Sequence, residues 1–179
     1  MHVRSTAKGY SIMNNDSVIN TLLNSMILYN EADPLRIQHS VKVHSFAKLI
    51  AENEKLSAET VQLIEIAAIL HDVGIRAAEK KYGHQNGKLQ EQEGPAVAED
   101  LMRKAGVDDE ELIGRVKYLI GHHHTYTNID GADYQILVEA DFLVNLFEDK
   151  EPVSAVKHVR DRIFKTASGI KLIETMYGI

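Results

Sequence analysis

The stretch LIEIAAILHDVG, residues 63–74, decides the fold of this 179-residue chain. Its first eight residues are apolar apart from Glu65, so a helix formed from them is apolar nearly all the way round. Such a helix is expected at the centre of a domain, because it has no polar side to turn toward water. The stretch ends in the doublet His71-Asp72. We therefore expect a central helix that carries two polar candidate ligands at its end.

The sequence on both sides of this stretch favours helices. The chain has three prolines and eleven glycines, and long runs rich in Ala, Leu, Ile, Glu and Lys. We expect the all-α class, as a compact bundle of about six to eight helices. The expected helices cover about 16–30, 34–54, 57–74, 95–104, 108–122 and 134–147, followed by one opened by Pro152 and a short one near residue 169. Residues 74–94, rich in Gly, Gln, Lys and Glu, are expected to be irregular.

Length and composition exclude several classes of protein. The length fits a single helical domain over residues 16–179, preceded by a loose arm over residues 1–15. The absence of cysteine excludes disulfides, Cys-based zinc sites and Cys nucleophiles. A net charge of -6 argues against a dedicated duplex-DNA binder. No window approaches eighteen apolar residues, so no membrane span is expected. The expected location is cytoplasmic, and the oligomeric state stays open.

Three of the expected helices carry His or Asp on an apolar face. His39 lies four residues after Leu35 and four before Val43, so it points into the core. His71 and Asp141 likewise follow apolar residues at offsets of three and four. An ionised carboxylate is costly to bury unless it is paired or binds a metal, so we expect one cation here. Imidazole and carboxylate ligands suit Fe, Mn, Zn, Ni or Co, with Mg as a further candidate. The expected ligands are His39, His71, Asp72 and Asp141.

This pattern resembles the H…HD…D signature of the HD-domain superfamily of metal-dependent phosphohydrolases. His71-Asp72 in AAILHDVG follows His39 by 32 residues, and Asp141 in VEADFLVN follows Asp72 by 69, intervals similar to those of the family. The resemblance covers roughly residues 30 to 150 and is to small stand-alone bacterial members. It implies that a metal-activated water cleaves a phosphoester or phosphoanhydride bond of a nucleotide or related phosphorylated metabolite. In this interpretation Asp72 and His71 are the catalytic residues.

Some members of that family hold a second metal ion with extra His residues between the HD doublet and the last Asp. Glu93 stands where the dinuclear members carry His, and a carboxylate can replace that ligand. In the run His122-His123-His124, His123 continues the apolar stripe of the preceding helix and is preferred, with His122 nearly as good. The expected second set is Glu93 with His122 or His123. The alternative is that the run is only a polar helix end.

Cationic and amide side chains near these ligands are candidates for binding a phosphorylated substrate. Arg36 precedes His39 by three residues, and Asn145 follows Asp141 by four. The expected substrate-binding residues are Arg36, Lys80, Lys81, His84, Lys88 and Asn145. The alternative interpretations are a surface salt bridge for Arg36 and a solvated loop for the lysines.

Two other functions stay open at this point. A non-catalytic sensor would bind a metal ion and a nucleotide in the same pocket and control a partner. A di-iron oxygenase of the same fold is the other alternative. Turnover of a small phosphorylated substrate, which is the expected partner, separates the hydrolase from the sensor.

Overall fold

A computed structural model of the protein describes residues 15–179, and within that range it is helical and contains no strand. The all-α prediction is therefore confirmed. The arm expected over residues 1–15 lies, apart from Asn15, outside the described residues. None of the described helices is both long and apolar enough to cross a membrane. The helices are α1 (Asn15–Tyr29), α2 (Pro34–Asn53), α3 (Ala58–Leu70), α4 (Gly74–Tyr82), α5 (Gly87–Lys104), α6 (Glu110–Ile120), α7 (Ala132–Glu148), α8 (Val153–Ile163) and α9 (Ala167–Tyr177).

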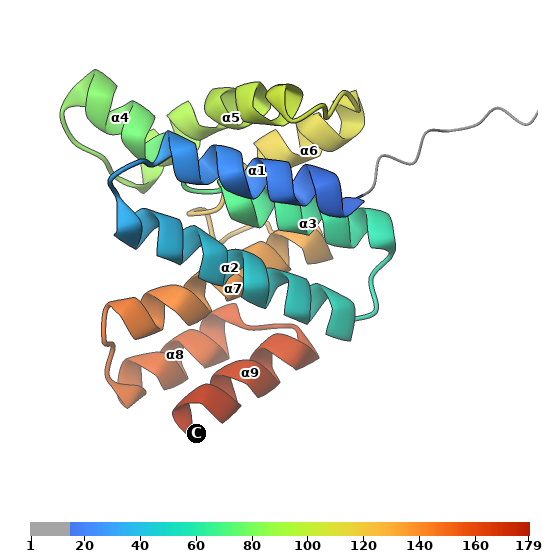
Figure 1. Cartoon of the computed structure of the whole chain (residues 1–179). Helices are drawn as coiled ribbons and strands as arrows, with labels where there is room; N and C mark the ends of the chain where they lie inside the picture. The colour runs from blue at the N-terminus through green and yellow to red at the C-terminus, as the bar shows by residue number, and fades with distance from the viewer. Residues whose placement is uncertain (1–14) are drawn as a thin grey trace, which may run out of the picture.

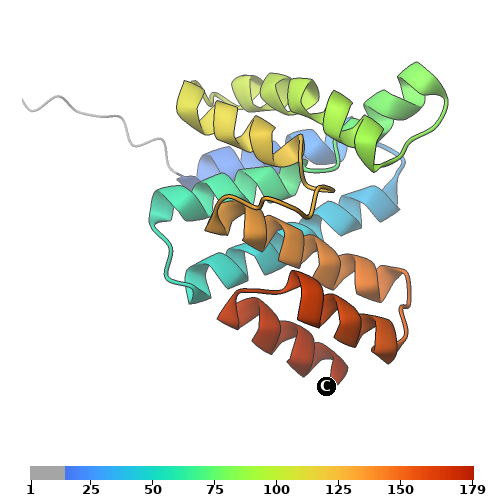
Figure 2. The same cartoon turned by 180° about the vertical axis from the view of Figure 1, so that it is seen from behind.

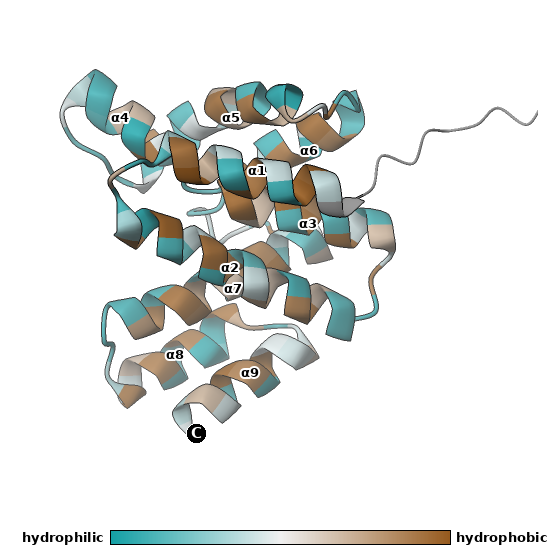
Figure 3. Cartoon of the chain, in the orientation of Figure 1, coloured by the Kyte–Doolittle hydropathy of each residue, from teal (hydrophilic) through white to brown (hydrophobic). Residues whose placement is uncertain are grey.

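Helix α3 lies at the centre of the bundle, as its apolar sequence predicts. Helices α1, α2, α6 and α7 pack around it, and its residues 64–70 are all buried. Figures 1 and 2 show α1 and α2 on one side of α3, with α6 and α7 on the other. Brown and teal segments alternate along the surrounding helices in Figure 3, as expected for helices that bury one face. The end of α3 is therefore enclosed by the bundle.

Residues 74–94 are helical apart from the turn at 83–86, and the prediction of an irregular stretch was wrong. Helix α4 ends at Gly83, whose φ of 77° is the left-handed conformation that glycine adopts without strain. Asn86 then caps α5, because its side chain accepts a hydrogen bond from the backbone N–H of Leu89 at 3.0 Å. Pro95, expected to begin a helix, lies inside α5. This segment is polar because it forms a hairpin of two helices, α4 and α5, at the surface of the protein.

Two glycines allow α5 to lie close to its neighbours, Gly74 at the contact with α4 and Gly94 at the contact with α6. A Cβ atom on Gly74 would be 2.4 Å from the carbonyl oxygen of Gln90, and one on Gly94 would be 2.7 Å from Cγ2 of Ile120. Larger residues would push the helices apart at both points. The close approach places Gln90 of α5 beside the turn that follows α3.

The apolar stripe predicted for α2 holds for only part of its length. Val43 and Ile50 are fully buried, but Leu35 is 81% exposed. Leu35 is the second residue of α2, and this first turn lies beyond the packed core. The placement of Leu35 in the core was therefore wrong, whereas His39, one turn further on, is buried.

A buried carboxylate joins α7 to the turn between α8 and α9. Glu139 has no exposed surface, and it accepts hydrogen bonds from the backbone N–H groups of Lys165 at 2.6 Å and Thr166 at 2.9 Å. The hydroxyl of Thr166 and the amide of Gln135 also donate to it. Gly169 packs against this carboxylate, because a Cβ atom there would lie 2.0 Å from Oε2.

Gly169→Ala is expected to destabilise the protein by about 1–3 kcal/mol, because the methyl group would push the Glu139 carboxylate away from its donors. Gly114→Ala is the matched control: no atom lies within 4 Å of its Cβ position, and alanine favours a helix over glycine by about 0.5–1 kcal/mol. Urea unfolding should shift the two midpoints in opposite directions. A Gly169→Ala midpoint equal to that of the wild type would show that the carboxylate moves at no cost.

A second buried carboxylate joins α2 to α3. Glu65 is only 6% exposed, and Oε1 accepts hydrogen bonds from Nε2 of His44 at 2.9 Å and from Nζ of Lys48 at 3.0 Å. Burial alone would raise the pKa of Glu65, but these two partners outweigh burial and hold the pKa below its ordinary value of 4.5. The folded state therefore favours the ionised form.

Because the pKa of Glu65 is lower in the folded chain, its ion pairs stabilise the fold above about pH 4.5, and this contribution is lost as the pH falls through the folded-state pKa. Glu65→Gln is expected to lower the free energy of unfolding by about 1–2 kcal/mol at neutral pH. Thermal unfolding of both proteins between about pH 3 and pH 7 tests this. A difference between them that does not shrink at acid pH would contradict the prediction.

Candidate metal centre

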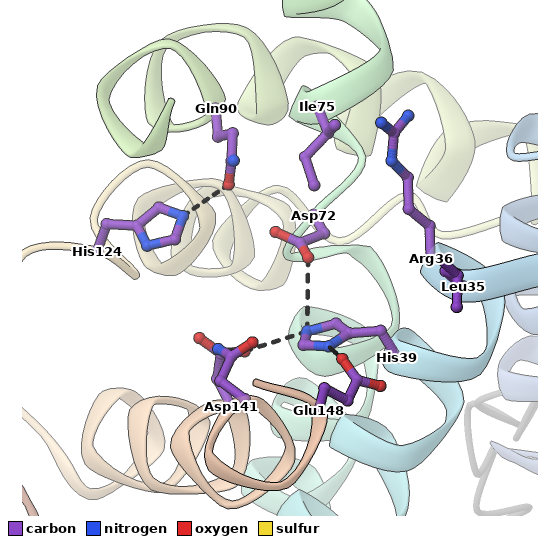
Figure 4. A pocket seen from close by; sticks show the side chains of 10 residues that line it. Leu35, Arg36, His39, Asp72, Ile75, Gln90, His124, Asp141 and Glu148 are labelled. Atoms are coloured by element: carbon purple, nitrogen blue, oxygen red, sulfur yellow. Dashed lines mark hydrogen bonds and ion pairs between the residues drawn. The ribbon is translucent and has the colours of Figure 1, made fainter. Parts of the chain in front are cut away.

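The side chains of His39, His71, Asp72 and Asp141 meet at one point, although they come from distant parts of the chain. The Nε2 atoms of His39 and His71 are 3.2 Å apart. Nε2 of His39 is also 3.1 Å from Oδ1 of Asp141 and 3.5 Å from Oδ2 of Asp72. Figure 4 shows His39, Asp72 and Asp141 pointing toward one another from α2, the turn after α3, and α7. The structure thus brings the four predicted ligands together.

The ends of α3 and α6 orient two of the imidazole rings. Carbonyl groups in the last turn of a helix have no helical partner. His71 follows the end of α3, and its Nδ1–H donates to the carbonyl of Ala68 at 2.8 Å. His123 follows the end of α6, and its Nδ1–H donates to the carbonyl of Ile120 at 2.8 Å. Both rings therefore turn Nε2 away from the backbone and toward the carboxylates of the site.

The Nε2 atom of His123 indicates that the site fits a cation. This atom is buried, has no hydrogen-bond partner among the described residues, and lies 3.5 Å from Oδ1 of Asp72. A buried polar atom without a partner costs free energy, and coordination of a metal ion would satisfy it. Neutral imidazole nitrogens and carboxylate oxygens are the donors that first-row transition metals bind.

His124 lies beside His123 and completes a second group of possible ligands. Its Nε2–H donates to Oε1 of Gln90 at 2.6 Å, which leaves Nδ1 with a lone pair. Burial and the neighbouring His123 lower the pKa of His124 to about 4, so the ring is neutral near pH 7. Asp72, His123 and His124 each offer one ligand atom, and these three atoms lie within 4.8 Å of one another. The same holds for His39, His71 and Asp72, so Asp72 belongs to both groups.

Tyr134 of α7 holds the turn that carries these two histidines. Its hydroxyl donates to the carbonyl oxygens of His122 and Thr125, on either side of His123 and His124. The ring of Tyr134 is almost fully buried, so this anchor is fixed in the core. The turn after α6 is thereby tied to the helix that carries Asp141.

The carboxylates of the site favour a positive charge between them. Burial alone would raise the pKa of Asp141, but its hydrogen bonds with His39 and His71 hold that pKa well below its usual range. Burial likewise works against ionised Asp72, but nearby His71 and His123 lower its pKa. Burial favours the neutral ring of His39, yet Asp141, Asp72 and Glu148 together raise its pKa to about 9. Protons on the imidazoles or a metal ion can supply this positive charge.

These side chains open into a pocket of about 270 Å³ (Figure 4). Arg36 at its edge forms two hydrogen bonds with the carboxylate of Glu79 on α4, at 2.5 and 3.0 Å. Asn145 donates to Oδ1 of Asp141 at 2.9 Å. The pocket is lined by Leu35, Arg36, His39, Asp72, Ile75, Gln90, His124, Asp141, Asn145 and Glu148.

The structure does not bring Glu93 and His122 to this pocket. The carboxylate of Glu93 accepts hydrogen bonds from Lys81 at 2.9 Å and from Tyr82 at 2.8 Å, on the surface of the α4–α5 hairpin. His122 stacks on Tyr118 with ring centroids 4.3 Å apart. Its Nδ1–H donates to the Tyr118 carbonyl. The helical offsets used to choose among the three histidines do not apply here, because α6 ends at Ile120 and the run lies in a turn.

Of the predicted substrate-binding residues, Arg36 and Asn145 line the pocket. Lys80 and Lys81 instead line a separate hollow beside Tyr29 and Arg76. His84 and Lys88 are exposed and are not among the residues that line the pocket. The helical structure of residues 74–94 explains the difference, because α4 turns its lysines outward.

Sequence reasoning missed Glu148, Gln90 and His124. Glu148 lies seven residues after Asp141, two turns along the same face of α7, so helical spacing could have found it. Gln90 lies in the segment predicted to be irregular, where no helical register assigns it a face. His124 requires knowledge of the turn after α6, for which the sequence carries no periodic signal.

Comparison with known proteins is consistent with this geometry. The family model described as HD domain matches residues 36–167, well over half of the chain. The crystal structure of a predicted HD superfamily hydrolase from an uncultured Thermotogales bacterium is similar, with a TM-score of 0.61 and 26% sequence identity. The similarity covers 91% of this chain and 84% of that one. No curated protein matches the sequence. The resemblance seen in the sequence is confirmed, and the chain belongs to the HD domain family.

Proposed function

We propose that this protein is a metal-dependent hydrolase that cleaves a phosphoester or phosphoanhydride bond of a nucleotide or a related phosphorylated metabolite. Membership of the HD domain family and the likeness to a predicted hydrolase support the reaction class. The observation that carries the proposal is the convergence of the imidazole Nε2 atoms of His39 and His71 on the carboxylates of Asp72 and Asp141. Fe, Mn, Zn, Ni and Co suit these donors, and Mg is a further candidate.

A divalent ion bound to these residues supplies a water of lowered pKa and a positive charge beside the phosphoryl oxygens. The residues of the chain hold that arrangement. Asp72 turns Oδ2 toward His39 and His71, at 3.5 and 3.4 Å, and Oδ1 toward His123. Asp72 is therefore the carboxylate common to the two ligand groups, and we assign it the proton of the attacking water. His71 holds its place through the Ala68 carbonyl.

The charges around the pocket explain why a phosphorylated substrate would need the metal. Asp72, Asp141 and Glu148 all line the pocket, and the charge of Arg36 is offset by Glu79. An anionic substrate would be repelled by these carboxylates in the absence of a cation. One or two divalent ions reverse the local field, and Arg36 and Asn145 then contact the substrate from the pocket wall.

Asp72→Ala is expected to reduce hydrolysis by about 100-fold or more, because it removes both a metal ligand and the proposed base. The measurement is phosphate release from p-nitrophenyl phosphate and from a panel of nucleotides, with each candidate metal added to chelator-treated protein. Asp108→Ala is the control, since Asp108 is an exposed aspartate that does not line the pocket. Unchanged turnover in Asp72→Ala would refute the mechanism. Nucleotide binding without turnover under every metal would favour the sensor.

We propose that a second ion, where present, is held by Asp72, His123 and His124. His124→Ala is then expected to lower the metal content from two ions per chain to one, because it removes one of three ligands. His122→Ala is the matched control, because that neighbouring ring stacks on Tyr118 instead. Elemental analysis after dialysis against dilute metal measures the ratio. Equal metal content in the two variants would contradict this assignment.

A further inference from the structure

Carbonyl groups at helix ends orient His71 and His123, but His39 is not at a helix end. It lies inside α2, where the carbonyl groups of the preceding turn accept hydrogen bonds from the helix itself. No backbone acceptor is therefore available to fix which ring nitrogen of His39 carries the proton. The acceptor has to come from a side chain of another helix.

Glu148, at the end of α7, provides that acceptor. Its Oε2 lies 2.8 Å from Nδ1 of His39, so the Nδ1–H donates to a carboxylate (Figure 4). The other oxygen of Glu148 accepts a hydrogen bond from Lys42, one turn after His39 on α2. Lys42 thus holds the carboxylate in place from the same helix that carries the ring.

Glu148 and Asp141 contact opposite nitrogens of the same ring. Asp141 meets Nε2 at 3.1 Å and Glu148 meets Nδ1 at 2.8 Å, and the two acids lie seven residues apart on one face of α7. The two acids of α7 therefore hold the His39 ring at both of its nitrogens. Nε2 faces Asp141, Asp72 and His71. A metal ion bound there would replace the proton on Nε2, while Glu148 keeps the proton on Nδ1.

We propose that Glu148 is a positioning residue for the metal centre, which acts through His39 and which Lys42 holds in place. The inference rests on the proposed metal site. A carboxylate on Nδ1 fixes the tautomer and the ring orientation, and it makes Nε2 a stronger donor to a metal ion. Glu148 contributes to metal affinity without contacting the ion.

The test measures the affinity of chelator-treated protein for Zn²⁺ and Mn²⁺ by competition with a metal-binding dye. Glu148→Ala is expected to weaken binding by about 10–100-fold. Glu148→Gln, which keeps an acceptor for Nδ1–H but not the charge, is expected to weaken it less. Glu151→Ala is the control, because it removes the same charge from an exposed position close to α7. Thermal unfolding of the metal-free proteins shows whether each variant is folded.

A double-mutant cycle separates an effect through His39 from direct attraction of the ion by Glu148. In a His39→Ala background, Glu148→Ala is expected to change the affinity by no more than about twofold. An undiminished loss in that background would overturn the proposal, as would wild-type affinity in Glu148→Ala itself.

The outcomes also separate this inference from the proposed hydrolase. If the wild type binds metal and Glu148→Ala binds it equally well, only the positioning role fails. If the wild type binds metal tightly and Glu148→Ala weakly, but neither hydrolyses a phosphorylated substrate, the positioning role holds and the hydrolase fails. If the wild type binds none of the candidate metals, Fe, Mn, Zn, Ni, Co and Mg, both are refuted.

Discussion

Two ionised carboxylates, Asp72 and Asp141, lie in the interior of this helical bundle and can stay there only with positive charge beside them. The imidazole rings of His39 and His71 lie beside them at short distances, and protons on these rings or a metal ion can meet that requirement. The packing of α2, α3 and α7 fixes these distances, because His39 and Asp141 lie on helix faces that also form the core, and His71 and Asp72 lie in the turn that ends α3. The contacts that form the core therefore also position the side chains of the site.

The histidines of the site are oriented by two different means. His71 and His123 follow helix ends and use carbonyl groups that the helices leave unpaired, so their orientation depends on backbone structure alone. His39 and His124 depend on side chains of other helices, Glu148 and Gln90. Substitution can change the second pair of contacts without disturbing any helix.

The placement of the four proposed ligands was predictable from sequence because helical spacing holds inside helices, where His39 and Asp141 share faces with buried apolar residues. The same reasoning was wrong where the chain leaves a helix. Beyond Ile120 the three histidines follow a turn, and no offset of three or four identifies His124. Between residues 74 and 94 the polar composition conceals two helices that glycine contacts hold together. Loop geometry and packing between surface helices leave little periodic signal in a sequence.

The hydrogen bonds of Glu139 tie α7 to the segment that follows α8, and so affect how the domain could be shortened. Glu139 lies two residues before Asp141 on α7, and its hydrogen-bond donors Lys165 and Thr166 belong to the segment that leads into α9. A fragment that stopped after α7 would retain every proposed ligand, yet Glu139 would lose the donors that Lys165 and Thr166 provide. The contacts that hold α7 in place therefore reach past Thr166, well beyond the last residue that lines the pocket.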